Sequence, residues 1–294
     1  MAKDIEPKLK LISEYLKINT DEIFVIPEYQ RGYSWNIVQC DKLWQDVESF
    51  IDSGINDPYF FGTVIVDCSN TNKFSLIDGQ QRTTTFLLLL KALLLRIEEV
   101  LMTIKKDDDS ESLIDGLKEK KNIIFDILYK TDADERSDIL KNWSLVKERK
   151  LLDNKSINEQ YKSELQIIIE SRDFKTAEQL CYKIPRKQKD NKYTNFFRNF
   201  KFFYEKLDEY KESELNSFAK TFLKKCQIIE IRSWQIEQAI TMFNSLNSTG
   251  MPLSDADIIS AQLYSNAGNN KEDFNELWES ICKIATDLSL RKII

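Results

Sequence analysis

Five consecutive residues combine a carboxylate, a glycine, two amides and a guanidinium: Asp78, Gly79, Gln80, Gln81 and Arg82. An apolar run precedes them and a leucine-rich stretch follows, which predicts a strand, a tight turn and a helix. A helix start favours an anion, glycine permits a close backbone approach, and arginine binds phosphate in a bidentate manner. Asp78 is placed to bind a metal or an attacking water, and Thr83 adds a hydroxyl. The pattern predicts a phosphate or nucleotide site, and it fits an ordinary turn with an N-cap equally well.

The leucine-rich stretch, which runs to Leu95, predicts a buried core helix. It is too short to span a membrane, and Lys91 interrupts it. No Gly-Lys-Ser/Thr follows the preceding turn, so the turn is not a Walker loop, and it does not match the dinucleotide-binding fingerprint.

A second polar loop, PEYQRGYSW at residues 27–35, carries Gln30, Arg31, Tyr33 and Trp35. An arginine flanked by aromatic residues can bind a phosphate while the rings stack on a base. The same residues can instead pack the loop against the core. Taken alone, the loop favours packing.

The composition limits the chemistry that is available. The 294 residues are 42% hydrophobic and 31% charged, as in a globular protein, and the net charge of −6 argues against a generally basic nucleic-acid binder. The chain has no histidine, which excludes Ser-His-Asp and Cys-His catalysis and histidine metal ligands within these residues. Five scattered cysteines suit a reducing compartment, and the start lacks an apolar signal core. We expect a cytoplasmic protein.

We expect an α+β fold in two parts, residues 1–104 and residues 105–294. In the first part, residues 6–18 predict an amphipathic helix, and the segments 59–66 and 74–77 predict a β-hairpin. Both polar loops follow predicted strands, and ligand sites usually form at strand ends on such sheets. The first part is therefore the expected ligand-binding core.

The second part predicts mainly helices. The segment 226–232 predicts a strand that returns to the N-terminal sheet. The aromatic residues of 191–210 fall on one helical face, which favours core packing over base stacking. Asn247 and Gly250 suit a turn before another helix. The Asn247 amide, the Gly250 backbone and Asp257 could equally contact a ligand.

Four motifs together resemble a known family. They are Ile-Pro-x-Tyr-Gln-Arg-x-Tyr-x-Trp at 26–35, Tyr-Phe-x-Gly at 59–62, Ile-Asp-Gly-Gln-Gln-Arg at 77–82 and Asn-Ser-x-Gly-x-Pro-Leu-Ser-x-x-Asp at 247–257. This order resembles the N-terminal domain of GmrSD-type modification-dependent restriction enzymes and related anti-phage proteins. The Asp-Gly-Gln-Gln-Arg signature is the most specific of the four.

The resemblance covers residues 5–267 in outline. It implies a small ParB/sulfiredoxin-like mixed sheet with helices, followed by a mostly α-helical region. In the family, this domain binds and often hydrolyses nucleoside triphosphates, and that activity regulates cleavage of modified phage DNA. The resemblance therefore implies a Mg²⁺-dependent NTPase in a bacterial restriction or anti-phage defence protein.

The resemblance also implies roles for particular residues. Carried over by motif, the phosphate site would comprise Asp78, Gly79, Gln80, Gln81, Arg82 and Thr83, with Gln30, Arg31 and Tyr33 on the opposite wall and Asn247, Gly250 and Asp257 approaching from the helical region. Arg31 and Arg82 would neutralise phosphate charge. Asp78 would hold Mg²⁺ or orient water, and Gln81 would complete the catalytic group. Ser260 and Ala261 depart from the family's pattern, and no ligand role is assigned to them.

Many family members carry a C-terminal histidine-metal nuclease domain, which these residues cannot form because they lack histidine. The expected partners are a nucleoside triphosphate, a nuclease domain or subunit, modified DNA and a second copy of the chain, with no membrane partner. The alternative function is a non-catalytic module that senses modified DNA or a nuclease partner through the same cleft. A sulfiredoxin-like thiol enzyme has little support, because no cysteine lies beside the Asp-Gly-Gln-Gln-Arg turn.

Overall fold

The computed structural model describes residues 5–105, 110–157, 159–184 and 195–247, and the single positions Leu277, Ser280 and Ile281. Across these ranges the chain forms one mixed sheet with helices on both sides, so the predicted α+β class is confirmed. The six strands are β1 Ile5–Leu11, β2 Ile23–Ile26, β3 Tyr59–Asp67, β4 Lys73–Asp78, β5 Leu152–Asn154 and β6 Cys226–Ser233.

The strands lie in the order β1-β6-β3-β4-β2-β5. The β3–β4 pair is antiparallel, as the predicted hairpin requires, and β1 is antiparallel to β6. The pairs β2–β4, β2–β5 and β3–β6 are parallel. Because β6 lies between the edge strand β1 and β3, a late segment of the chain pairs with two strands from the first 70 residues.

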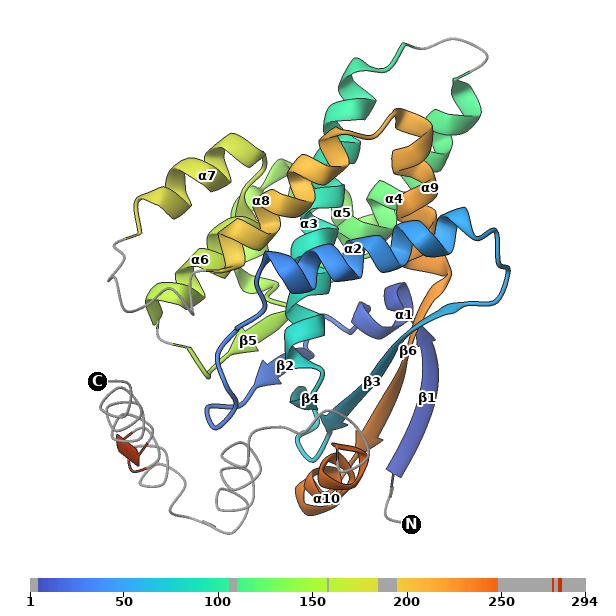
Figure 1. The fold of residues 1–294 in the computed structure, drawn as a ribbon. Coiled ribbons are helices and arrows are strands. Elements are labelled where there is room, and N and C mark those ends of the chain that lie inside the picture. Colours follow the sequence, from blue (N-terminus) through green and yellow to red (C-terminus); the bar gives the residue numbers. More distant parts are fainter. Residues whose placement is uncertain are drawn as a thin grey trace, which may run out of the picture.

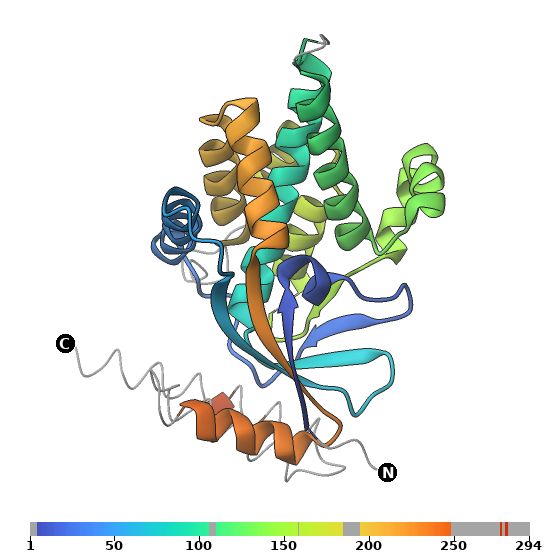
Figure 2. The ribbon, with the colours of Figure 1, turned by 90° about the vertical axis from the view of Figure 1, so that its right-hand side faces the viewer.

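The helices are listed in chain order: α1 Ile12–Leu16, α2 Ile37–Asp52, α3 Gln80–Thr103, α4 Glu111–Tyr129, α5 Ala133–Lys141, the 3-10 helix η1 Trp143–Glu148, α6 Glu159–Glu170, α7 Phe174–Tyr182, α8 Asn195–Asp208, α9 Glu212–Lys224 and α10 Ile236–Asn247. Figures 1 and 2 show the larger helices gathered on one side of the sheet, with α3 among them, and α10 on the other side. The sheet is therefore the middle of three layers.

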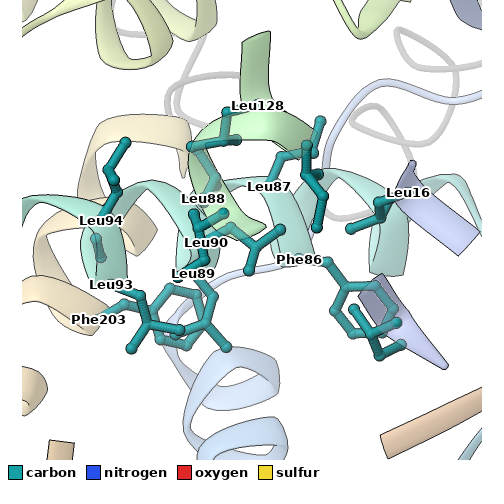
Figure 3. Close-up of a cluster of buried hydrophobic side chains, with 14 of the residues drawn as sticks. Leu16, Phe86, Leu87, Leu88, Leu89, Leu90, Leu93, Leu94, Leu128 and Phe203 are labelled. Atoms are coloured by element: carbon teal, nitrogen blue, oxygen red, sulfur yellow. The ribbon is translucent and has the colours of Figure 1, made fainter. Parts of the chain in front are cut away.

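The main core surrounds α3. Leu88, Leu89 and Leu90 have no exposed surface, because other elements pack on every side of this helix. Figure 3 shows the α3 side chains pointing in several directions, some toward Leu128 of α4 and others toward Phe203 of α8. Burying each such side chain contributes roughly 1.5–3 kcal/mol. The prediction of a buried core helix is confirmed.

One charged residue lies inside this core. Lys91 has no exposed surface, and its Nζ atom donates hydrogen bonds to the Tyr129 hydroxyl at 2.8 Å and the Ser171 carbonyl at 2.6 Å. Both partners are neutral, so burial dominates and lowers the pKa of Lys91 to about 7.

A smaller core lies on the opposite face of the sheet. Ala239, Ile240 and Phe243 of α10 pack on Ile65 of β3 and Ile77 of β4. Seven described residues are buried in this cluster, far fewer than in the core around α3. This small core holds α10 against the strand ends that form the polar turn.

The predicted N-terminal helix at residues 6–18 is wrong. Residues 5–11 form β1 and only residues 12–16 are helical, because β1 pairs with β6 along its whole length. The helical spacing of the apolar residues does not correspond to a buried face, since Leu9 is 60% exposed whereas Leu16 is fully buried. Long-range pairing has therefore overridden the helical spacing.

Candidate functional site

The turn between β4 and α3 brings a carboxylate, a left-handed glycine and a helix start together. Asp78 is the last residue of β4, and Gly79 has a φ of 86° and precedes α3. A Cβ atom at Gly79 would lie 2.6 Å from Cγ2 of Val64 on β3, so a larger residue would clash. The first N–H groups of a helix have no intrahelical partner, and this end of α3 therefore favours an anion.

Gln81 fixes the loop after β2 to this turn. Its Oε1 atom accepts hydrogen bonds from the backbone N–H groups of Ser34, at 2.8 Å, and Trp35, at 3.2 Å. Its Nε2 atom donates to the Gly32 carbonyl at 3.1 Å. Both ends of the amide are thus engaged by the loop. These hydrogen bonds show that Gln81 positions the loop, and its catalytic role stays a prediction.

Gln80 makes a second connection to the same loop. It donates from Nε2 to Oε1 of Gln30 at 2.8 Å, and Gln30 donates in turn to the Ile77 carbonyl at 2.9 Å. The Oε1 atom of Gln80 is buried and has no hydrogen-bond partner among the described residues. The two polar loops predicted from the sequence therefore form one hydrogen-bonded unit.

Arg82 is tied to a bulge in β3. Its guanidinium donates to the carbonyl of Phe61 and, at 2.7 Å, to that of Thr63. These carbonyls flank Gly62, which has a φ of 98°, and the β3–β6 register shifts at the same place. A Cβ atom at Gly62 would collide with the guanidinium. Arg82 therefore supports β3, and some of its N–H groups remain for a ligand because arginine has five.

A pocket of about 310 Å³ opens at the turn. Its lining comes from the loop after β2, the end of β4, the start of α3 and α10: Gln30, Arg31, Trp35, Ile77, Asp78, Gly79, Gln80, Gln81, Arg82 and Phe243. Arg31 is exposed, and no ion pair or side-chain hydrogen bond is found for it within the described ranges. The pocket therefore carries two cations, of which Arg31 is the more available.

Asp78 is the one carboxylate among the described residues of this lining. Burial raises the pKa of Asp78, while Arg82, the Gly79 N–H group and Arg31 oppose that rise. Nη2 of Arg82 lies 3.8 Å from the Asp78 carboxylate. No group of three or more acidic or cysteine side chains able to bind a metal is found in the described part of the chain. Mg²⁺ commonly uses one or two carboxylates together with substrate phosphates, so Asp78 fits a metal that arrives with a nucleotide.

Two predicted binding residues lie in the core and not in the pocket lining. Tyr33 is 1% exposed, and its hydroxyl is hydrogen-bonded to Oγ1 of Thr85 and Nδ2 of Asn199. Thr83 is fully buried and donates to the Gly79 carbonyl at 3.0 Å. Tyr33 therefore stabilises the loop from the core side, and Thr83 stabilises the start of α3.

Of the three site residues predicted from the helical region, the structure describes only Asn247. Asn247 is the last residue of α10, and Gly250 and Asp257 lie outside the described residues. α10 does reach the pocket, but through Phe243. Sequence reasoning missed Phe243 as a pocket residue, because its place in the lining depends on where α10 packs.

The cysteines do not support a thiol enzyme. Four of them, Cys40, Cys68, Cys181 and Cys226, are buried thiols, and Cys282 lies outside the described residues. Burial raises the pKa of the thiols of Cys40, Cys68 and Cys226 to about 12, 11 and 12, which disfavours the reactive thiolate.

The GmrSD restriction endonuclease N-terminal domain model matches residues 11–264. The chain belongs to this family. The family identifies it as a component of a restriction or defence protein, as the four motifs predict. No curated protein sequence matches the GmrSD-family chain. None of the helices in the described ranges is long and apolar enough to cross a membrane.

Proposed function

We propose that this domain binds a nucleoside triphosphate at the pocket around Asp78, hydrolyses it, and thereby regulates DNA cleavage by a nuclease domain or subunit. The observation that carries the proposal is the convergence of Arg31, Arg82 and Asp78 at the N-terminus of α3. Two guanidinium groups and a helix N-terminus complement a polyphosphate. The family membership supports the link to restriction.

The pocket also has an apolar component that suits a base. Trp35 of the loop and Phe243 of α10 both line it. Aromatic rings stack on bases at about 1–3 kcal/mol per base, with little dependence on sequence. In this arrangement the phosphates lie toward the start of α3, and the aromatic pair contacts the base.

Arg31, Arg82 and Asp78 have different roles, which follow from how strongly other groups already hold each side chain. Arg31 binds the phosphates and orders its exposed side chain when it does so. Arg82 contributes its remaining N–H groups from a fixed position, because two carbonyls of β3 hold it. Asp78 would hold Mg²⁺ or orient the attacking water. The metal, when bound, neutralises charge on the phosphates.

The first experiment measures binding and phosphate release with Mg²⁺ and each of the four NTPs. The variant Arg31→Ala should weaken NTP binding by about tenfold or more, because it removes a charge-assisted hydrogen bond. Lys17→Ala is the matched control, since Lys17 is an exposed cation outside the pocket. Equal affinity in the wild type and Arg31→Ala would remove Arg31 from the site.

A second variant separates binding from hydrolysis. Asp78→Asn keeps the shape of the side chain and removes its charge, so hydrolysis should fall by about 100-fold or more. The affinity measured without Mg²⁺ should change by less than about fivefold. Turnover at the wild-type rate would rule out the role of Asp78. No binding of any NTP would favour the alternative, a non-catalytic module that senses modified DNA or a nuclease partner.

A further inference from the structure

A second cavity, of about 190 Å³, opens beside β5, and none of its described lining residues lines the Asp78 pocket. We call it the β5 cavity. Leu87 of α3, Leu128 of α4 and Leu165 of α6 form its apolar part, with Val146 of η1. Each of these side chains belongs to the main core. The cavity is therefore a gap where the main core reaches the surface.

The described polar residues of the lining include more cations than carboxylates. Arg149, Lys150 and Lys162 supply three cations, and Asp153 and Glu170 supply two carboxylates. The Glu170 carboxylate already accepts a hydrogen bond from Nε2 of Gln166.

The cations are not equally available to a ligand. Arg149 is bound to the carboxylate of Glu135 and to the Lys130 carbonyl. Lys150 is exposed, and no ion pair is found for it in the part of the chain that the structure describes. At least one cation can thus turn to a ligand at the cavity mouth without breaking an ion pair.

We infer that the β5 cavity binds a small amphiphilic anion, with its apolar body against the leucines and its carboxylate or phosphate beside Lys150 and Lys162. Burial of the apolar body supplies most of the affinity, and the cations orient the head group. The cavity volume limits the body to a short chain or a single ring. This inference does not depend on nucleotide binding at Asp78.

The cavity is also connected to the loop that carries Arg31. Leu152, Asp153 and Asn154 of β5 line the cavity. Just beyond them, the Lys155 N–H group donates to the Ile26 carbonyl at 2.9 Å. The following residue, Ser156, donates from its hydroxyl to the Arg31 carbonyl at 3.4 Å.

A three-residue edge strand has few contacts of its own, so a ligand against β5 should stabilise it. It should also stabilise the backbone at Arg31 through the contacts that follow β5. Arg31 is exposed and is therefore a site at which trypsin can cleave. A ligand that binds only the docked form of β5 should slow this cleavage.

Calorimetry with hexanoate, octanoate, octanol and octylammonium tests the ligand class. Octanoate should bind one site per chain, and each added methylene should strengthen binding by about fourfold until the cavity is full. Octanol should bind more weakly than octanoate, and octylammonium most weakly. No saturable binding, or tighter binding of octylammonium, would overturn the inference.

Variants test the location. The double variant Lys150→Gln, Lys162→Gln should weaken octanoate by about fivefold or more and leave octanol unchanged. The matched control is Lys147→Gln, Lys155→Gln, which changes two exposed lysines that do not line the cavity. Equal loss in both double variants would show only a general charge effect and would refute the site.

Trypsin cleavage after Arg31, followed by mass spectrometry, tests the connection. At ten times its dissociation constant, octanoate should slow this cleavage by about tenfold. Cleavage at Lys17, which is far along the chain from β5 and exposed, is the internal control. An unchanged rate at Arg31 while octanoate binds would refute the connection.

Discussion

The face of the sheet beneath α3 and the face beneath α10 are covered to very different extents. The α3 side has a continuous core that includes the leucines of α3 and the aromatic residues of α8. The cluster on the α10 side contains seven buried residues in the part of the chain that the structure describes. The Asp78 pocket takes residues from both sides, with Gln80 to Arg82 from α3 and Phe243 from α10. The comparison indicates that global stability comes from one face and that the site depends on both.

The largest expected effect is on the α3 side. Leu90→Ala should lower the free energy of unfolding by about 2–5 kcal/mol, because Leu90 has no exposed surface and the cavity cannot easily collapse. Denaturant titration measures this change. Met102→Ala on the same helix, at a residue that is 82% exposed, is the control and should change little. Equal effects would contradict the assignment of stability to this core.

The pH dependence of stability tests the buried Lys91 in the core on the α3 side. Its pKa of about 7 in the folded state lies below its unfolded value, so the unfolded state binds more protons above pH 7. The contribution of Lys91 to wild-type stability therefore rises between about pH 7 and pH 10. In Lys91→Met, the stability relative to wild type should fall by about 1.4 kcal/mol per pH unit over pH 7.5–9. Parallel pH profiles of the two proteins would contradict this expectation.

Gly79 tests the turn where the two faces meet. Gly79→Ala should cost about 1–3 kcal/mol of backbone strain, and the contact with Val64 adds to it. Gly54→Ala is the matched control, because Gly54 also has a positive φ but has open space around its Cβ position. Thermal unfolding should show the larger loss for Gly79→Ala. An equal loss would mean that the contact with Val64 is relieved at no cost.

The smallest global effect is expected on the α10 side. Ile240→Ala should lower the free energy of global unfolding by less than about 1 kcal/mol, because α10 can open locally before the main core unfolds. Hydrogen exchange of the α10 amides should nevertheless become faster, while the amides of α3 remain protected. Loss of protection in both helices together would show that the two faces unfold as one unit.

The sequence predicted the elements that depend on local pattern. The β3–β4 hairpin, α3 and its polar first turn follow from short apolar runs and one glycine. β1 was mistaken for a helix because its partner, β6, lies more than 200 residues away in the chain. β5 was missed because three residues carry too little pattern.

The site was predicted at the level of its loops but not of every side chain. Gln30, Arg31 and Asp78 do line the pocket. The pattern could not show that Tyr33 faces inward, because an aromatic residue in a loop fits either orientation. Nor could it show that Gln81 is held by the loop, since its partners are backbone N–H groups that any residue provides.

α3 has a mechanical consequence. Its 24 residues form a rod of about 36 Å, at 1.5 Å per residue, that starts at the Asp78 pocket and ends near the exposed Met102. Core side chains pack against this helix along most of its length. A ligand that tilts the first turn therefore has two possible effects. It moves the whole helix as a rigid body, which displaces the distant end, or it bends the helix and leaves that end in place.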